Sequence, residues 1–346
     1  MTTRRTLCVA GVLGLAAAAF AVQPSVSHAA DPFYDGKTLR IIVGAGVGGG
    51  YDAYGRMLAP LFSQQLGATV VVENLPGGGG LRALNKLAAE PGNGLSIHLA
   101  NGAATSLTQL LGMPGAKYDL TKFEFLGIVD YSRWNFLVSP NSPFNSVADV
   151  IKAGKTKKIS WGASGKISGL SDGAAFTCHA LGIQCRIVTG YKGSAAAALA
   201  MTQGEMDALY VSETSAYNYV KSKGAKALTT MNRQRSILFP DVPTIFELMP
   251  NLTEDQKWWI DFHATVESLG RVLIAPPGTP KNLVEALTKA THNILSDPKV
   301  VADGAKKKRF IKYIPAADAK KVLLKVLASA TPEQKARIKK VALSTY

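Results

Sequence analysis

Two glycine-rich segments carry the residues best suited to bind a ligand. Residues 44–52 read Gly-Ala-Gly-Val-Gly-Gly-Gly-Tyr-Asp, and residues 73–80 read Glu-Asn-Leu-Pro-Gly-Gly-Gly-Gly. Because glycine has no side chain, several backbone N–H groups of such a segment can approach one point, and a helix that begins there adds the positive end of its dipole. We therefore predict that each segment forms a cradle for an anion.

The first segment also matches the dinucleotide-binding pattern Gly-x-Gly-x-x-Gly, at Gly44, Gly46 and Gly49, with Glu73 roughly where a ribose-binding acid would lie. Asp52 argues against a dinucleotide, since its carboxylate would lie beside the pyrophosphate. The second glycine segment argues against it too, because two neighbouring cradles suit a small anion better than an extended dinucleotide. We expect a small anion and no cofactor.

Histidine and serine form none of the usual catalytic patterns. His98, His179, His263 and His292 are scattered along the chain without a His-Glu-x-x-His pair. The sequence also lacks a Gly-x-Ser-x-Gly nucleophile segment and a metal-binding cysteine spacing. We predict no catalytic residue, no metal site and no enzyme, and the alternative is an exported hydrolase or a nucleotide-cofactor oxidoreductase.

The N-terminal segment indicates the compartment. Arg4 and Arg5 form a short positive region, residues 7–20 are apolar, and residues 27–29 (Ser-His-Ala) provide a small-x-small cleavage site. The apolar stretch is shorter than the roughly 20 residues that a membrane-spanning helix needs. We predict that residues 1–29 are a cleavable signal peptide and that the mature protein is periplasmic, where soluble nicotinamide cofactor is scarce.

The formal net charge of +15 at pH 7 favours anionic partners through long-range attraction. Many of the lysines lie between residues 306 and 340, where we interpret them as the solvated faces of helices. Aromatic residues that would stack on bases are not interleaved with this charge, so we predict no nucleic-acid partner.

The elements that must position these residues alternate between strands and helices, with glycine and proline at the joints. This alternation is typical of a parallel α/β fold, and the chain is longer than one hydrophobic core usually organises, so we expect two lobes. No low-complexity linker is present, which suggests that strands connect the lobes. The predicted strands are 39–43, 69–72, 96–100, 125–129, 136–139, 158–161, 186–189, 207–211 and 227–230, and the predicted helices are 52–66, 81–89, 147–153, 171–181 and 195–203.

Two cysteines, Cys178 and Cys185, remain after the signal peptide. Cys178 falls near the end of a predicted helix, Gly182 turns the chain, and Cys185 opens a predicted strand. In an oxidising compartment a disulfide across this turn is expected. Two reduced, buried cysteines remain the alternative, because sequence does not show the distance between their Cα atoms.

Several short motifs, weak alone, are specific in their order and spacing. After the first strand and its glycine segment come residues 70–80 (Val-Val-Val-Glu-Asn-x-Pro-Gly-x-Gly-Gly), residues 191–194 (Tyr-Lys-Gly-Ser), residues 241–247 (Asp-Val-Pro-Thr-x-x-Glu) and residues 275–280 (Ala-Pro-Pro-Gly-Thr-Pro). In these motifs the chain resembles the tripartite tricarboxylate transporter receptor family, also called the Bug receptors, across nearly the whole mature sequence.

This resemblance implies a class II periplasmic-binding-protein fold, with two α/β lobes and a ligand cleft between them. Lobe I would comprise residues 31–130 and 231–346, and lobe II residues 131–230. The implied function is that of a monomeric periplasmic receptor, which captures a small organic anion such as a carboxylate and delivers it to the membrane subunits of a transporter. A sensor or scaffold that uses the same fold stays open.

The resemblance further implies that main-chain amides and ordered waters hold the ligand carboxylate. The site residues carried over by position are Gly48, Gly49, Gly50, Tyr51, Asp52, Pro76, Gly77, Gly78 and Gly79 in lobe I, and Ala163, Ser164, Ser168, Tyr191, Lys192, Gly193 and Ser194 in lobe II. Asn101 and Thr105 are weaker candidates.

Some of these residues have a second interpretation. Asp52 could bind ligand or cap a helix, and both roles stay open. Trp258 and Trp259 could close over a bulky ligand, but we favour core residues of an extra helix in lobe I, and Tyr51 could equally pack.

Overall fold

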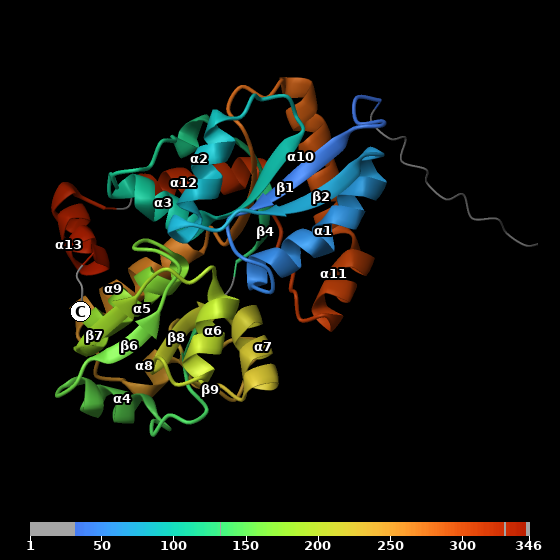
Figure 1. Cartoon of the computed structure of the whole chain (residues 1–346). Coiled ribbons are helices and arrows are strands. Elements are labelled where there is room, and N and C mark those ends of the chain that lie inside the picture. The colour runs from blue at the N-terminus through green and yellow to red at the C-terminus, as the bar shows by residue number, and fades with distance from the viewer. Residues whose placement is uncertain (1–31, 132, 329, 344–346) are drawn as a thin grey trace, which may run out of the picture.

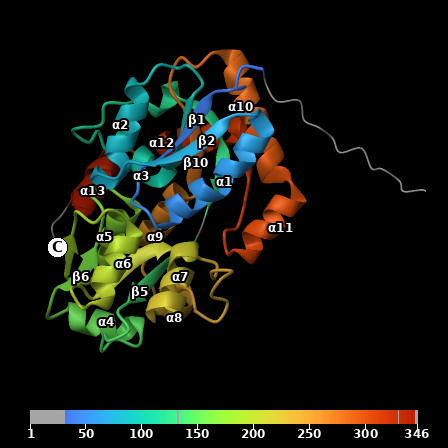
Figure 2. The same ribbon diagram turned by 45° about the vertical axis from the view of Figure 1, so that its right-hand side comes forward.

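The computed structural model describes residues 32–131, 133–328 and 330–343, and the predicted signal peptide, residues 1–29, lies outside them. Two α/β lobes lie one above the other, as Figures 1 and 2 show. Each lobe is built around its own sheet, and the chain passes from one sheet to the other after β4 and back before β10. The predicted two-lobed α/β fold is confirmed.

The lobe I sheet has the strand order β11-β4-β10-β3-β1-β2 in the described part of the chain. Side chains alternate between its two faces, so Ile41 and Val43 pack in one core and Ile42 in the other. Helices α1 and α10 cover the first face, and α2, α3 and α12 cover the second. These elements are β1 (Thr38–Val43), β2 (Thr69–Asn74), β3 (Ser96–Asn101), β4 (Glu124–Asp130), β10 (Arg271–Ala275), β11 (Ile314–Pro315), α1 (Gly50–Leu66), α2 (Leu81–Ala89), α3 (Gly102–Leu110), α10 (Lys281–Ser296) and α12 (Ala316–Ala328).

The lobe II sheet has the order β7-β6-β8-β5-β9 among the described residues. Its central strands are fully buried, which explains why they read as continuous apolar runs in the sequence. Its elements are β5 (Trp134–Val138), β6 (Ile159–Gly162), β7 (Cys185–Val188), β8 (Ala208–Ser212), β9 (Lys226–Thr230), α4 (Val147–Gly154), α5 (Gly169–Leu181), α6 (Ser194–Thr202) and α7 (Glu213–Lys223).

The sheets are mixed, and in this respect the expected parallel pattern is wrong. Strand β10 is antiparallel to β3 and β4, and β5 is antiparallel to β8 and β9. Both are strands that enter a sheet from the other lobe. Such a strand begins at the edge of the sheet that faces the cleft. It therefore runs in the direction opposite to the strands that end at this edge and lead into helices.

Helix α9 (Glu254–Glu267) packs mainly against α5, with smaller contacts to α3. Trp259 is fully buried, and its ring centroid lies 5.4 Å from that of Phe176 and 4.7 Å from that of His179, both on α5. Trp259 is therefore a packing residue, but against a helix of lobe II and not in the interior of lobe I, whereas the partly buried Trp258 stacks on Phe262 of its own helix. Helix α13 (Pro332–Leu343) also packs on α5.

Two further helices, α8 (Ile245–Leu248) and α11 (Pro298–Lys306), and two short 3-10 turns, Gly78–Gly80 and Leu120–Lys122, complete the described elements. Most lysines of the C-terminal helices are exposed. This fits the interpretation of that charge as solvated helix faces.

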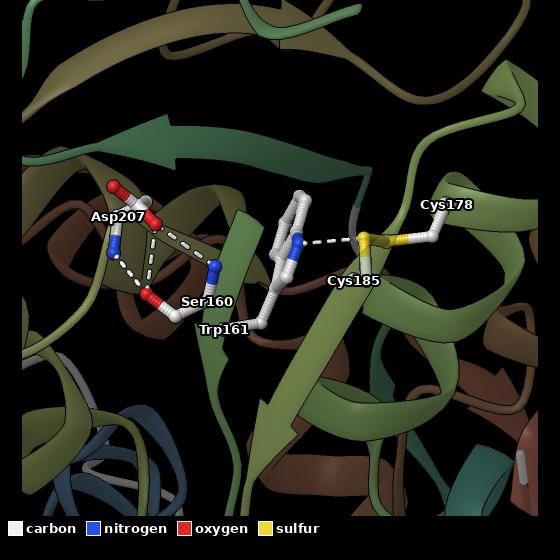
Figure 3. Close-up of a disulfide and its surroundings, with 5 residues drawn as sticks. All are labelled: Ser160, Trp161, Cys178, Cys185 and Asp207. Carbon is white, nitrogen blue, oxygen red and sulfur yellow. Dashed lines mark hydrogen bonds between the residues drawn. A yellow bond between two sulfur atoms is a disulfide. The ribbon is translucent and has the colours of Figure 1, made fainter. Parts of the chain in front are cut away.

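A disulfide joins Cys178, in the last turn of α5, to Cys185, the first residue of β7 (Figure 3). Gly182 ends α5 in the left-handed conformation with φ 63°, so the chain reverses and brings the two Cα atoms within 6.3 Å. The indole N–H of Trp161 donates to the sulfur of Cys185 at 3.1 Å. The cross-link thereby ties α5 to the lobe II sheet.

Candidate functional site

A cavity lies between the lobes and is lined by both of them. Its volume is about 780 Å³, including the space that opens to solvent. Eleven of the residues that the sequence analysis selected line it: Gly49, Gly50, Tyr51, Gly77, Gly79, Ser164, Ser168, Tyr191, Lys192, Gly193 and Ser194. Asn101 and Thr105 line it as well. Gly48, Asp52, Pro76, Gly78 and Ala163 lie next to lining residues but do not contribute to the wall.

Among the described residues, six helices begin at the cavity wall. Each follows the carboxyl end of a strand, so the edges of both sheets direct helix N-termini into the cleft. The first N–H groups of a helix have no partner within it, and they carry partial positive charge. The N-cap residues of these helices all line the cavity: Gly49 for α1, Gly80 for α2, Asn101 for α3, Ser168 for α5, Gly193 for α6 and Ser212 for α7.

The charged side chains of the wall are Lys192 and Arg271, and no aspartate or glutamate of the described chain lines the cavity. Lys192 is exposed, whereas Arg271 is buried. Together with the helix N-termini, this distribution makes the cavity favourable for an anion.

Asp52 has a structural position beside the cavity. It is the third residue of α1, whose N-cap is Gly49, and its Oδ2 accepts the backbone N–H of Gly48 at 3.0 Å. Its Oδ1 lies 2.9 Å from the guanidinium of Arg56. Although burial alone raises the pKa of Asp52, the hydrogen bonds from Arg56 and Gly48 hold it below its ordinary value. Asp52 therefore folds the first glycine loop back onto its own helix.

The rim of the cleft is made of main chain. The N–H of Gly46, in lobe I, donates to the carbonyl of Lys192, in lobe II, at 2.6 Å. A Cβ atom on Gly46 would lie 2.7 Å from that carbonyl oxygen, which is too close. A Cβ on Gly79 would likewise collide with the carbonyl of Ile167, and one on Gly165 would lie 2.6 Å from the nitrogen of Gly79. The two lobes touch at these points because no side chain stands between them.

The base of the cleft is made of buried side chains centred on Arg271, the first residue of β10, whose side chain is 2% exposed. Its guanidinium donates to Asp130 at 2.6 Å and to the hydroxyl of Ser212, in lobe II, at 3.1 Å. It also lies over the rings of Tyr51 and Tyr54, at 5.0 and 4.3 Å from their centroids. Sequence reasoning missed Arg271, although a charged residue opening the apolar run Arg271–Ala275 was a visible signal.

Trp134 forms another part of the wall that sequence reasoning missed. Its ring stacks on Tyr210, with centroids 5.2 Å apart, and its side chain lies close enough to Glu267 to act on the pKa of that carboxyl. Gly169 lies against the ring edge, where a Cβ would collide with it. Trp134 is therefore held in one orientation.

Buried ionisable groups lie behind the wall of the cavity. Burial raises the pKa of Asp172 to about 8, against the hydrogen bonds that it accepts from Ser168 and Ser171. Burial also raises the pKa of Glu267 well above its ordinary value and lowers that of His263 to about 3. His98, on the wall itself, is neutral for the same reason, with a pKa lowered to about 3. At pH 7 this layer is uncharged.

The sequence of residues 55–342 matches the family model described as the tripartite tricarboxylate transporter family receptor. The chain belongs to this family. The predicted resemblance is thereby confirmed, and the protein is a periplasmic solute-binding receptor of the Bug type. The family consists of binding proteins, in line with the expectation of a receptor.

Individual relatives span almost the same length. The protein BugT of Bordetella pertussis is 26% identical over 319 residues, which cover 87% of this chain and 87% of the relative. The solved structure of the periplasmic binding protein BugD is 25% identical, with a TM-score of 0.74, covering 90% of this chain and 99% of its own. A structure of Rpa4515 from R. palustris with adipate is 18% identical, with a TM-score of 0.74 and coverage of 89% and 97%. The last likeness shows the fold alone.

In residues 32–131, 133–328 and 330–343, no helix has both the length and the apolar character needed to cross a membrane. The same residues contain no group of histidine, cysteine and acidic side chains arranged to hold a metal ion.

Proposed function

We propose that this receptor captures a small organic carboxylate between its lobes and delivers it to the membrane subunits of a tripartite tricarboxylate-type transporter. The observation that carries the proposal is the convergence of helix N-termini on a cavity whose described wall has no acidic side chain. Partial positive charges from several helices act on one small anion without a large desolvation cost, because backbone N–H groups are weakly hydrated compared with ammonium groups.

In this proposal the carboxylate is held mainly by backbone N–H groups at the start of α1 and α2. Gly49, Gly50, Gly77 and Gly79 line the cavity there, and their lack of side chains leaves the amides accessible. The hydroxyls of Ser164 and Ser168 add donors from lobe II. A ligand that bonds to both lobes stabilises the closed arrangement, in which the rim contacts of Gly46 and Gly79 form.

The adipate bound by the R. palustris protein supports a carboxylate as the class of ligand, since that protein has the same fold. We also propose the remaining features that the sequence predicted. These are a cleaved signal peptide at residues 1–29, a monomer, and lobe boundaries near residues 130 and 231, with α9 packing across them onto α5.

A thermal-shift screen of the purified mature protein against mono-, di- and tricarboxylates tests the proposal. A ligand that binds the folded state at a hundred times its Kd stabilises it by about 2.7 kcal/mol, so a true ligand raises Tm clearly. Alcohols and amines with the same carbon skeletons serve as matched controls. If no carboxylate raises Tm more than its control does, the proposed function is wrong.

A further inference from the structure

The wall of the cavity is divided into a polar and an apolar part. The glycine loops and serine hydroxyls supply hydrogen-bond donors. The apolar part combines the aromatic rings of Tyr51, in lobe I, and Trp134 and Tyr191, in lobe II, with the aliphatic side chains of Leu99, Leu170 and Val211. A ligand that fills such a cavity needs an apolar body as well as an anionic group.

Trp134 is the most firmly positioned of the three rings. One face is stacked on Tyr210, whose hydroxyl bonds to Nδ1 of His263 at 3.0 Å. The missing side chain of Gly169 leaves room for the ring edge, where a Cβ would lie 2.4 Å from the ring. Because Trp134 is 7% exposed and still lines the cavity, the part of its ring that reaches the cavity needs no reordering when a ligand binds.

The cations of the wall favour a ligand with one negative group. Arg271 is already paired with Asp130 at 2.6 Å, so its charge is compensated. Lys192 is exposed, at the contact between the lobes at the rim. A second carboxylate placed against the ring of Trp134 would have no free cation beside it, and burying an unpaired charge there is unfavourable. Away from the ring, the N-termini of α5 and α7, at Ser168 and Ser212, still carry partial positive charge.

We propose, building on the proposed function, that the cleft selects an aromatic monocarboxylate and that Trp134 is the residue that determines this specificity. The carboxylate binds at the helix N-termini, and the ring of the ligand packs against Trp134. Offset or edge-to-face packing of two rings adds to the gain from burial alone.

Calorimetric titration of the mature protein with benzoate, cyclohexanecarboxylate, hexanoate and adipate tests the inference. Cyclohexanecarboxylate has the same charge and carbon count as benzoate but is not flat. We expect benzoate to bind roughly three- to tenfold tighter than cyclohexanecarboxylate. We expect adipate to bind weaker than benzoate by roughly tenfold or more.

Two variants of Trp134 test whether this residue causes the preference for benzoate. Trp134→Leu should weaken benzoate roughly three- to tenfold and leave hexanoate unchanged, because only the aromatic ligand loses a ring contact. Trp134→Phe keeps a flat ring and should keep most of the preference. Trp258→Leu is the matched control, since Trp258 is a partly buried tryptophan of α9 that does not line the cavity, and its variant should bind all four acids like the wild type.

The outcomes separate the inference from the function on which it rests. Adipate or hexanoate binding at least as tightly as benzoate would overturn the inference and leave the proposed function standing. An unchanged preference for benzoate in Trp134→Leu would overturn the role of Trp134. If Trp134→Leu does not fold, the affinities of the wild type for the four acids and those of Trp134→Phe still test the inference. Failure of all four acids to bind would contradict the inference and, with a negative thermal-shift screen, the proposed function.

Discussion

The rim and the base of the cleft join the same two lobes by opposite means. At the rim, Gly46 and Gly79 bring main chain of one lobe against main chain of the other. At the base, Arg271 connects Asp130 to Ser212 through buried side chains. Rim contacts depend on the absence of side chains and can separate at little cost. Base contacts are buried charges and hydrogen bonds that are expensive to break.

This difference indicates which part moves. A hinge must keep its packing while the cleft opens, and the buried network at Arg271 lies beside both crossings between the lobes, next to Asp130 and at the start of β10. The glycine contacts lie in loops, where Gly46 and Gly79 are partly exposed. Substitutions at the base should therefore act on folding stability, and substitutions at the rim on ligand affinity.

The largest expected effect is on stability, from Arg271→Met. It leaves Asp130 buried without its partner at 2.6 Å, and we expect the free energy of unfolding to fall by about 3–5 kcal/mol. Arg233→Met is the matched control, since Arg233 pairs with Asp261 at 2.7 Å on the surface, and it should cost less than about 1 kcal/mol. Urea denaturation measures both.

A second variant distinguishes the loss of this ion pair from a general disruption of the fold. Adding Asp130→Asn to Arg271→Met removes the unpaired charge and should restore part of the lost stability. If Arg271→Met and Arg233→Met lower the free energy of unfolding equally, the contacts at the base stabilise the protein no more than a surface ion pair does.

The disulfide should give the next largest effect, and it lies in neither region. The bond between Cys178 and Cys185 closes a short loop in lobe II, and removing it should cost roughly 2–3 kcal/mol. Replacing both cysteines with alanine should lower Tm and leave the affinity for ligand unchanged, because neither residue lines the cavity. Quantitative labelling of two free thiols in unreduced, denatured protein would show that the bond is not formed.

The acids behind the base should make stability depend on pH. In the folded state Asp172 keeps its proton up to a pKa of about 8, whereas the unfolded chain releases it near its ordinary value. The folded state thus binds the additional proton between these values, and stability falls as pH rises towards 8. His98 and His263, with pKa values lowered to about 3, act in the opposite sense as pH falls through their ordinary pKa of about 6.5.

Between pH 6.5 and 8 the two histidines contribute equally to the wild type and to an Asp172 variant, so the difference between these proteins isolates the carboxyl group of Asp172. Between pH 6.5 and 8 we expect the wild type to lose about 1.5 kcal/mol more stability than Asp172→Asn. Glu267 contributes with the same sign, so the variant should keep part of the slope. Equal slopes for wild type and variant, measured by urea denaturation at both pH values, would contradict a neutral, buried Asp172.

The rim could be predicted from the sequence, and the base could not. A glycine loop and the helix that follows it are neighbours in the chain, so the local pattern at residues 44–52 predicted a cradle for an anion. The family resemblance then selected Gly49, Gly50 and Tyr51, which line the cavity. The local pattern does not show, however, which residues of a loop face the cavity. Gly78 and Gly79 look alike in sequence, yet only Gly79 lines the cavity and meets the carbonyl of Ile167.

The base is assembled from residues that are distant in sequence. Asp130 and Arg271 are 141 positions apart, and they meet because two strands that cross between lobes lie side by side in one sheet. The nine predicted strands correspond to β1–β9, as for β1 at 39–43, but β10 was not predicted, and its antiparallel pairing with β4 depends on the crossings. Without that pairing, Arg271 and Trp134 had no visible connection to the site.

The smallest expected effect is the most specific test of the rim. Gly46 has no positive φ, so alanine fits its backbone conformation, and the obstacle to a Cβ is Lys192 in the other lobe. Gly46→Ala should therefore fold with wild-type stability and fail to close fully. We expect the affinity for the tightest-binding carboxylate to fall by about 1 kcal/mol, the contribution of one hydrogen bond.

Small-angle scattering with and without that carboxylate shows whether the lost affinity reflects lost closure. The wild type should become more compact at saturation, and Gly46→Ala should become less so. Val47→Ala is the control, because Val47 is the adjacent loop residue, is 69% exposed, and should change neither affinity nor compaction. Gly79→Ala is a poorer test, since its φ of 72° would strain the loop in any arrangement of the lobes. Full compaction and unchanged affinity in Gly46→Ala would mean that the rim gives way around an added methyl group, and the division between a moving rim and a fixed base would then be wrong.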